Sequence, residues 1–235
     1  MRSASYEISK QMPAQLSFWL DVDNTLLDND ALKEYLDAQV RAILGEGEAA
    51  RFWVLYEEVR AELDVVDLPL TVRRYVAKSG NAAQGAALEH MLETIPFSTF
   101  LYPKALDVIR HLRMLGRVCI LSDGDEVFQR RKIERSGLAA AVDHQVLIYT
   151  HKEEHLAEVT ERWPAERYVL VDDKARILEA IARQLGDKVT TVHVRQGHYG
   201  REPLPPGFQP DISVAKIGDL LTFGADAFLG HARSG

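Results

Sequence analysis

Five short apolar runs, separated by amphipathic segments, place the strongest limit on the folds open to this chain. Each run is partly β-branched or aromatic and lacks the polar alternation of a half-exposed strand, which is typical of strands buried on both faces. The runs cover residues 16–20, 118–121, 146–149, 168–171 and 189–194. Helical patterns at 103–115 and 175–185 accompany them, and a glycine directly follows each. The alternation predicts an α/β fold with a parallel, five-stranded, Rossmann-like sheet flanked by helices.

A long segment separates the first two runs, several times the usual length of a crossover connection. Between residues 31 and 95 its apolar residues recur at helical spacing, in three stripes. We therefore expect a core domain of residues 1–28 and 99–235, and an all-helical cap of residues 29–98 inserted after the first strand. The cap is either a decorative bundle or a lid over a site. The proline-rich segment after the last run is predicted to be an extended loop, followed by a short helix at 214–221.

The charge balance excludes one class of partner. The chain has 28 Lys and Arg against 35 Asp and Glu, a formal net charge of −7, so it lacks the basic surface expected of a nucleic-acid-binding protein. Its apolar runs are too short to span a membrane, and the first residues show no signal-peptide pattern. The single cysteine, Cys119, excludes an intrachain disulfide. We expect a cytoplasmic protein that binds neither nucleic acid nor membrane, and the oligomeric state is left open.

Polar residues follow four of the strands, at the end where open α/β sheets bind ligands. They are Asp21 and Asp23 after the first strand, Ser122 and Asp123 at the second, Lys152 after the third, and Asp172 and Asp173 at the fourth. Four carboxylates brought together must bind a cation or take up a proton. Mg²⁺ suits such oxygen ligands. With Mg²⁺, one lysine and one protonated carboxyl group, the charges balance and the site can accept a dianionic substrate.

This order of motifs resembles that of the haloacid-dehalogenase (HAD) superfamily of phosphatases and phosphotransferases. The motifs are Asp-x-Asp-x-Thr, then Ser, then Lys, then Asp-Asp, and the helical insert is similar to the inserted cap of that family. The resemblance covers the chain from about residue 16 to residue 221. It implies that the first strand lies between the second and the fourth, so that the first and last motifs meet.

The resemblance also implies roles for the carboxylates. Asp21 is the expected nucleophile, and Asp23 is the expected general acid, which then activates water. The expected Mg²⁺ ligands are the Asp21 carboxylate, the main-chain carbonyl of Asp23 and the Asp173 carboxylate. Asp172 is expected to bind the metal directly or through water.

The phosphate ligands implied by the resemblance are Ser122, Asp123 and Lys152, which would bind the transferring group. Two features complicate the assignment of the lysine. Lys152 is followed by Glu153, where related phosphatases commonly have proline. Lys174 lies near enough in sequence to the last acidic pair to be a rival phosphate ligand.

The resemblance therefore predicts a Mg²⁺-dependent phosphatase, a phosphoric monoester hydrolase that acts on a small phosphorylated metabolite through an aspartyl-phosphate on Asp21. Asp23 favours this chemistry over dehalogenation, because an alkoxide leaves poorly without a proton, whereas a halide needs none. Two alternatives stay open. One is a phosphotransferase or sugar phosphomutase with the same intermediate, and the other is a catalytically silent protein that binds a phosphorylated ligand.

Two further strings have plainer interpretations. Residues 151–155 match an H-x-x-E-H zinc-peptidase pattern, but the first histidine closely follows a strand and no third ligand stands out. The basic run at 130–132 is predicted to be the solvated face of a helix.

Overall fold

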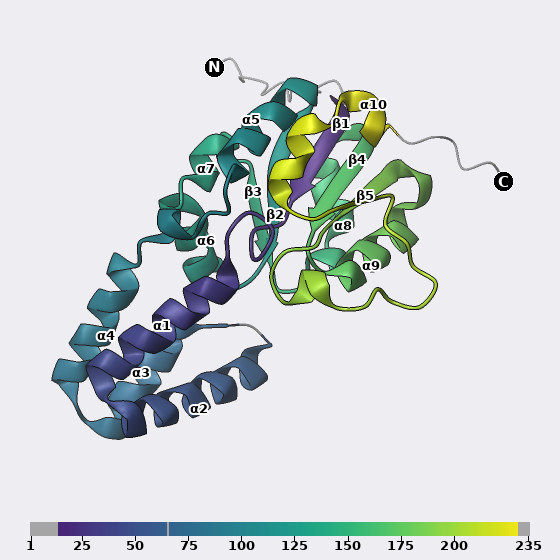
Figure 1. Ribbon diagram of the computed structural model, residues 1–235. Coiled ribbons are helices and arrows are strands. Elements are labelled where there is room, and N and C mark those ends of the chain that lie inside the picture. The colour runs from purple at the N-terminus through teal and green to yellow at the C-terminus, as the bar shows by residue number, and fades with distance from the viewer. Residues whose placement is uncertain (1–13, 65, 230–235) are drawn as a thin grey trace, which may run out of the picture.

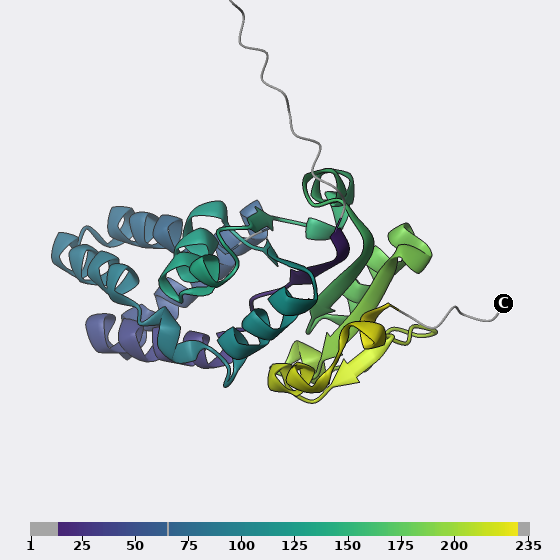
Figure 2. The same ribbon diagram turned by 90° about the horizontal axis from the view of Figure 1, so that it is seen from above.

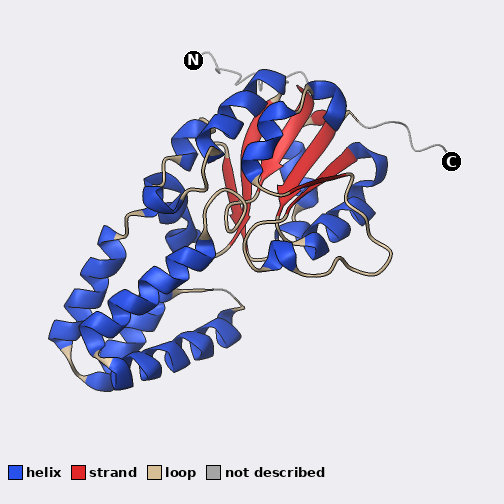
Figure 3. Ribbon diagram, viewed as in Figure 1, coloured by secondary structure: helices blue, strands red, loops and turns tan. Residues whose placement is uncertain are grey.

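A parallel sheet lies at one end of the computed structural model, which describes residues 14–64 and 66–229, and the helices between residues 29 and 94 extend away from it (Figures 1 and 3). Its strands are β1 (Ala14–Leu20), β2 (Arg117–Asp123), β3 (Val146–Tyr149), β4 (Ala165–Asp172), β5 (Val189–Val194) and β6 (Ile212–Val214). They lie in the order β3-β2-β1-β4-β5-β6, and every neighbouring pair is parallel. β1 thus lies between β2 and β4, and the strand order reverses beside it, where open α/β sheets bind ligands.

The sheet has six strands, one more than the sequence predicted. β6 lies in the proline-rich segment that was expected to be an extended loop, and it pairs with β5 through Ile212, Ser213 and Val214. A strand of three residues is too short to show a periodicity, and it follows directly on a run of prolines that suggests a loop. The helix expected next to it is present as a 3₁₀ helix, η5 (Ile217–Thr222).

Helices cover both faces of the sheet, which explains why the strands lack polar alternation. Trp19 and Leu170 face one side, where they pack with α8 (Leu156–Arg162) and α9 (Ala175–Leu185). Phe18 faces the other side, toward α5 (Ala105–Leu115) and α10 (Ala225–Phe228), and its ring meets that of Phe228 edge-on at 5.1 Å. The core domain is therefore a three-layered sandwich.

Four helices follow β1 and lie to one side of the sheet (Figure 2). They are α1 (Asn29–Leu44), α2 (Glu46–Leu63), α3 (Leu68–Ser79) and α4 (Ala82–Thr94). Asp28, Asp67 and Asn81 are the N-cap residues of α1, α3 and α4, and each side chain accepts a hydrogen bond from a main-chain N–H three residues later. Each helix packs on the next and α4 returns to α1, around buried residues such as Phe52 and Leu88. The domain boundaries given above stay a prediction.

The chain enters and leaves these four helices at one joint. The main-chain N–H of Asp28 donates to the carbonyl of Phe100 at 2.8 Å, and that of Tyr102 donates to the carbonyl of Leu26 at 3.0 Å. The remaining elements are η1 (Phe97–Phe100), α6 (Glu126–Arg135), α7 (Leu138–Ala141), η2 (Lys152–Glu154), η3 (Gly186–Lys188) and η4 (Tyr199–Arg201). None of the helices within the described residues combines the length and the apolar character needed to cross a membrane.

Candidate active site

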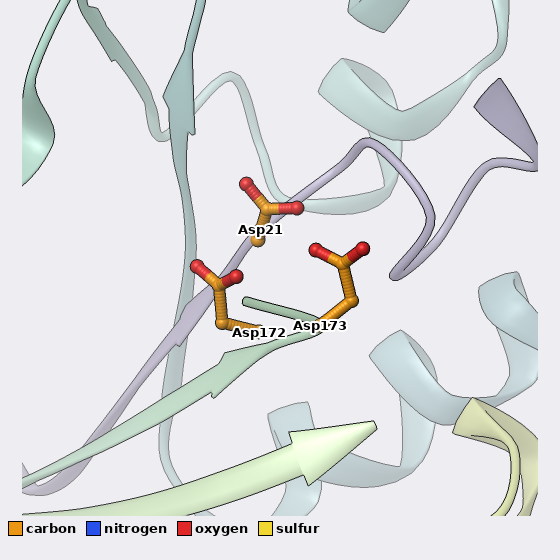
Figure 4. Close-up of side chains that lie close together, drawn as sticks. All are labelled: Asp21, Asp172 and Asp173. Atoms are coloured by element: carbon orange, nitrogen blue, oxygen red, sulfur yellow. The ribbon is translucent and has the colours of Figure 1, made fainter. Parts of the chain in front are cut away.

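Three carboxylates meet at the carboxyl ends of β1 and β4 (Figure 4). Asp21, Asp172 and Asp173 are all buried, and each offers an oxygen atom within 4.8 Å of those of the other two. The register of the two strands brings them together, because Leu20 lies beside Val171 and the Asp21 N–H donates to the Val171 carbonyl at 3.0 Å. Both strands therefore end at the same level, and the residues that follow Leu20 and Val171 lie next to one another.

A buried lysine completes this cluster. Lys152 begins η2 just after β3, and its ammonium lies 2.7 Å from Asp21 Oδ1 and 2.6 Å from Asp172 Oδ2. Its main-chain N–H donates to Asp123 Oδ1 at 2.9 Å, which fixes where the side chain starts. Burial alone would lower the pKa of Lys152, but the charges of Asp172, Asp21 and Asp123 raise it well above its usual value. The lysine is therefore charged.

The carboxylates outweigh this single ammonium. Burial, together with the charges of Asp172 and Asp21, raises the pKa of Asp173 to about 9, although Lys174 and Lys152 oppose the shift. Burial also raises the pKa of Asp21 to about 7, although Lys152 opposes the shift. Within the described residues, Asp21 Oδ2 and both oxygens of Asp173 have no hydrogen-bond partner. Such buried, unpaired oxygens are unfavourable unless a proton or a cation compensates for them.

The arrangement fits a divalent cation. When all three are ionised, the carboxylates exceed the charge of the Lys152 ammonium by two, and the unpaired atoms of the cluster are all oxygens, the ligands that Mg²⁺ prefers. Asp172 is already engaged, because Lys152 contacts its Oδ2 and the Lys174 N–H donates to its Oδ1 at 2.8 Å. Asp173 is the less engaged member of the pair, which favours it as the direct ligand.

Asp23 points to a different partner. Both of its carboxylate oxygens accept hydrogen bonds from Lys132 Nζ, at 2.7 and 3.0 Å. The prediction that the run 130–132 is a solvated face was wrong for Lys132, because only 4% of its side chain is exposed. The spacing within α6 carried the signal: Lys132 follows the buried Phe128 by one helical turn and precedes the buried Ile133.

The end of β2 supplies the remaining predicted residues. Ser122 is buried, and its Oγ accepts a hydrogen bond from Gln129 Nε2 at 2.9 Å. Asp123 lies at the last position of β2, with its Oδ2 at 3.8 Å from Lys152 Nζ. Gln129 was not identified from the sequence, because a glutamine inside a helix carries no pattern of its own. Asp125 accepts from two N–H groups at the start of α6 and is a helix cap.

A cavity of about 600 Å³ opens between these residues and the helices of the proposed cap. Trp53 and Tyr56 line it from α2, with their rings 5.3 Å apart in an edge-on arrangement. From the core, Lys174 and Tyr199 line it, and the Lys174 ammonium lies 5.3 Å from the centre of the Tyr199 ring. Asp23 faces the same cavity. The cavity therefore has an aromatic and charged wall and reaches the loop after β1 and the last residue of β2, while the three clustered aspartates lie buried behind its lining.

The H-x-x-E-H string forms no such site. His151 Nε2 lies 2.8 Å from Asp64 Oδ2, and the ring of His155 stacks on that of Tyr149 at 4.2 Å. In residues 14–64 and 66–229, the only cluster of potential metal ligands is that of the three aspartates. His151 and His155 thus have other partners, Asp64 and Tyr149.

The sheet order, the four helices after β1 and the strand-end carboxylates define a hydrolase fold of the HAD type. A family model described as haloacid dehalogenase-like hydrolase matches residues 18–194. The chain belongs to the haloacid dehalogenase-like hydrolase family.

Solved structures agree with this assignment. A haloacid dehalogenase-like hydrolase of Burkholderia xenovorans is 42% identical, with a TM-score of 0.82, over 92% of this chain and 99% of that chain. A magnesium-bound HAD hydrolase of Bacillus subtilis is 19% identical, with a TM-score of 0.56, over 87% and 96%. An L-2-haloacid dehalogenase of Xanthobacter autotrophicus is 18% identical, with a TM-score of 0.54, over 89% and 97%. The search of curated proteins found no match.

These findings correct the predicted enzyme class. The assignment as a phosphoric monoester hydrolase was wrong, because structures of the same fold include L-2-haloacid dehalogenases. Hydrolase is the class that stands. Both oxygens of Asp23 accept from Lys132, and its expected role as the general acid stays a prediction.

Proposed function

We propose that this chain is a Mg²⁺-dependent hydrolase in which Asp21 attacks the substrate and forms a covalent ester. The observation that carries the proposal is the unequal environment of the two Asp21 oxygens. Oδ1 accepts from Lys152 at 2.7 Å, while Oδ2 has no hydrogen-bond partner within the described residues. One oxygen is thereby held in place and the other is left for bonding, as a nucleophilic carboxylate requires.

The residues proposed to hold Mg²⁺ are the carboxylates of Asp21 and Asp173 and the main-chain carbonyl of Asp23, with Asp172 direct or through water. When bound, the cation supplies positive charge that neutralises the buried carboxylates and an anionic substrate. Support comes from the oxygen-only ligand set and its uncompensated charge. Because Asp173 has a pKa of about 9, metal binding at neutral pH should release a proton.

The proposed reaction has two steps. Asp21 attacks an electrophilic centre and displaces the leaving group, while Ser122, Asp123 and Lys152 surround the anionic part of the substrate. Asp23 then takes a proton from water, which hydrolyses the ester and frees Asp21. The cavity of about 600 Å³ supports a small molecule as the partner. A cytoplasmic location belongs to the same proposal, and the single, buried Cys119 is consistent with a reducing compartment.

An ¹⁸O-labelling experiment identifies the group that is transferred to Asp21. Transfer of a phosphoryl group would give an aspartyl-phosphate, and displacement of a halide would give an ester to carbon. In a single turnover in H₂¹⁸O, water attacks the carboxyl carbon of a carbon ester and leaves ¹⁸O in Asp21. Water attacks phosphorus in an aspartyl-phosphate, so Asp21 stays unlabelled. Mass spectrometry of the peptide that contains Asp21 separates the two.

The test of the proposal is an assay with two substrate panels, each with Mg²⁺ and with EDTA. One panel contains 2-haloacids, read by halide release, and the other contains phosphorylated small molecules, read by phosphate release. We expect Asp21→Asn to keep its fold, shown by circular dichroism, and to lose turnover and the covalent ester together. Turnover retained by Asp21→Asn would remove Asp21 as the nucleophile. A wild-type protein that binds these compounds without turnover would instead be a silent binding protein.

A further inference from the structure

Lys132 is a buried cation without a role in the reaction described so far. It lies in the second turn of α6, on the buried face with Phe128 and Ile133, and 4% of its side chain is exposed. Its ammonium lies 5.9 Å from the centre of the Phe128 ring. Burying an ammonium group is unfavourable unless its N–H donors form hydrogen bonds. The groups that accept these bonds therefore stabilise Lys132 in its buried position.

All three donors of the ammonium have an acceptor. Two hydrogen bonds go to Asp23, at 2.7 Å to Oδ1 and 3.0 Å to Oδ2, and the third goes to Asn29 Oδ1 at 3.2 Å. The two acceptors belong to different parts of the molecule. Asp23 lies in the loop after β1, two residues beyond the proposed nucleophile, and Asn29 is the first residue of α1. Lys132 thus connects the reactive loop with the start of the proposed cap.

The start of α1 is attached to the same loop by other contacts. Asn24 Oδ1 accepts from the N–H groups of Asn29 and Asp30, at 3.0 and 3.2 Å. Asp30 in turn accepts from the N–H of His198 at 2.8 Å. These bonds hold the main chain at the start of α1. The bond between the Lys132 and Asn29 side chains differs from them, because the same ammonium also binds the Asp23 carboxylate. A change in the position of α1 therefore reaches the loop through Asn24 and reaches the carboxylate oxygens of Asp23 through the Lys132 ammonium.

We propose that Lys132 is a positioning residue that makes the orientation of the Asp23 carboxylate depend on the position of the cap. The proposal rests on the proposed function and adds regulation of that same site by the cap. With α1 in the position seen here, three hydrogen bonds fix the ammonium, and the ammonium fixes both oxygens of Asp23. When α1 moves away, Lys132 loses its third acceptor, and the Asp23 carboxylate is free to rotate. Water is then activated efficiently only with the cap in place.

The kinetic test uses Lys132→Met, Lys132→Arg and, as the matched control, Arg131→Met on the neighbouring position of the same helix. The assay uses the substrate from the two panels that turns over fastest. Misplacement of a catalytic group by about 1 Å costs on the order of 100-fold in rate, so we expect kcat of Lys132→Met to fall by about 10- to 100-fold. Lys132 lines the cavity, but its donors are already used by Asp23 and Asn29, so we expect KM to change by less than about 3-fold. Lys132→Arg, whose guanidinium can still donate to both oxygens, should recover most of kcat, and Arg131→Met should equal wild type.

A second variant tests the connection to the cap without removing the charge. Asn29→Ala keeps the Lys132–Asp23 pair and deletes the third bond. We expect a fall in kcat of about 3- to 10-fold, and no further fall when Asn29→Ala is added to Lys132→Met, because both changes break the same path. Hydrogen–deuterium exchange with Mg²⁺ alone should show faster exchange at residues 29–34 in both variants and not in Arg131→Met.

Three results would overturn the proposal: a wild-type kcat in Lys132→Met, a loss that appears only in KM, or a Lys132→Arg variant no better than Lys132→Met. Additive losses in the double variant would overturn the connection to Asn29. Failure of the proposed function gives a different result, namely turnover by Asp21→Asn. The rates of the Lys132 variants can still be compared with one another in that case. Exchange measurements need no substrate, so the connection to α1 is tested even if neither panel is turned over.

Discussion

Replacing Asp173 by asparagine should stabilise the metal-free protein. Asparagine has nearly the same volume as aspartate but cannot ionise, so it removes the charge and keeps the packing. Burial and the charges of Asp172 and Asp21 raise the pKa of Asp173 from 3.8 to about 9. At pH 7 the unfolded chain has therefore released this proton, whereas the folded protein retains it. Folding of the wild-type protein at pH 7 thus requires proton uptake, which is unfavourable.

The size of the effect follows from the shift. About three pH units separate the pKa of the unfolded chain from pH 7, and each unit is worth about 1.36 kcal/mol, which gives an upper bound of about 4 kcal/mol. Relaxation of the site reduces it, so we expect a gain of about 2–4 kcal/mol for Asp173→Asn in EDTA at pH 7. For a chain of this length, that gain raises the melting temperature by roughly 4–16 °C. An acid whose pKa is raised in the folded state lowers the free energy of unfolding, and this loss grows from about pH 4 up to the pKa of the folded state. The stabilisation by Asp173→Asn should therefore fall below about 2 kcal/mol at pH 5.

The assay is thermal and urea unfolding in EDTA at pH 5 and pH 7, with Asp172→Asn as the matched control. Asp172 is equally buried, but its Oδ2 lies 2.6 Å from Lys152 Nζ, so its loss should destabilise. Added Mg²⁺ should raise the stability of the wild type and have little effect on Asp173→Asn. The reasoning is refuted if Asp173→Asn unfolds more easily than the wild type at pH 7 in EDTA. It is equally refuted if the gain is the same at both pH values.

Two further changes test the surroundings of this cluster. Lys152→Met leaves Asp21 and Asp172 without their common cation, so we expect a loss of about 3–5 kcal/mol in urea unfolding at pH 7; an unchanged midpoint would contradict the ion-pair geometry. Gly197→Ala places a methyl group against the Asn24 side chain at a positive φ of 61°. We expect a loss of at least about 1–3 kcal/mol and slower turnover, checked by melting and steady-state rates, and wild-type behaviour would show that the loop can move aside.

The core of the fold could be predicted because its strands are buried on both faces. β1 to β5 appear in the sequence as short apolar runs, and the residues that follow them converge because parallel strands end at one edge. Asp21, Lys152, Asp172 and Asp173 were found in this way. β6 was not found, because three residues at a sheet edge show no periodicity, and what places them there is pairing with β5.

Lys132 shows what the sequence pattern left out. A run of three basic residues predicts a solvated helix face. Lys132, the third of them, is buried because it binds the Asp23 carboxylate, which lies more than a hundred residues away in the sequence. The bond that the enzyme breaks was also beyond the sequence. The fold includes haloacid dehalogenases, so the fold by itself does not identify the leaving group. Trp53 and Tyr56 on α2 line the cavity, and they carry no motif.

The joint between the two parts of the molecule sets how one can move against the other. Asp28 and Phe100, and Leu26 and Tyr102, are bonded pairwise, so the outgoing and returning chains form a narrow two-stranded neck. A body carried on such a neck can tilt or twist about it but cannot slide along the sheet. A tilt about this neck would widen the cavity between Asp23 and α2 least beside the neck and most at the side farthest from it, so solvent would enter first at that far side.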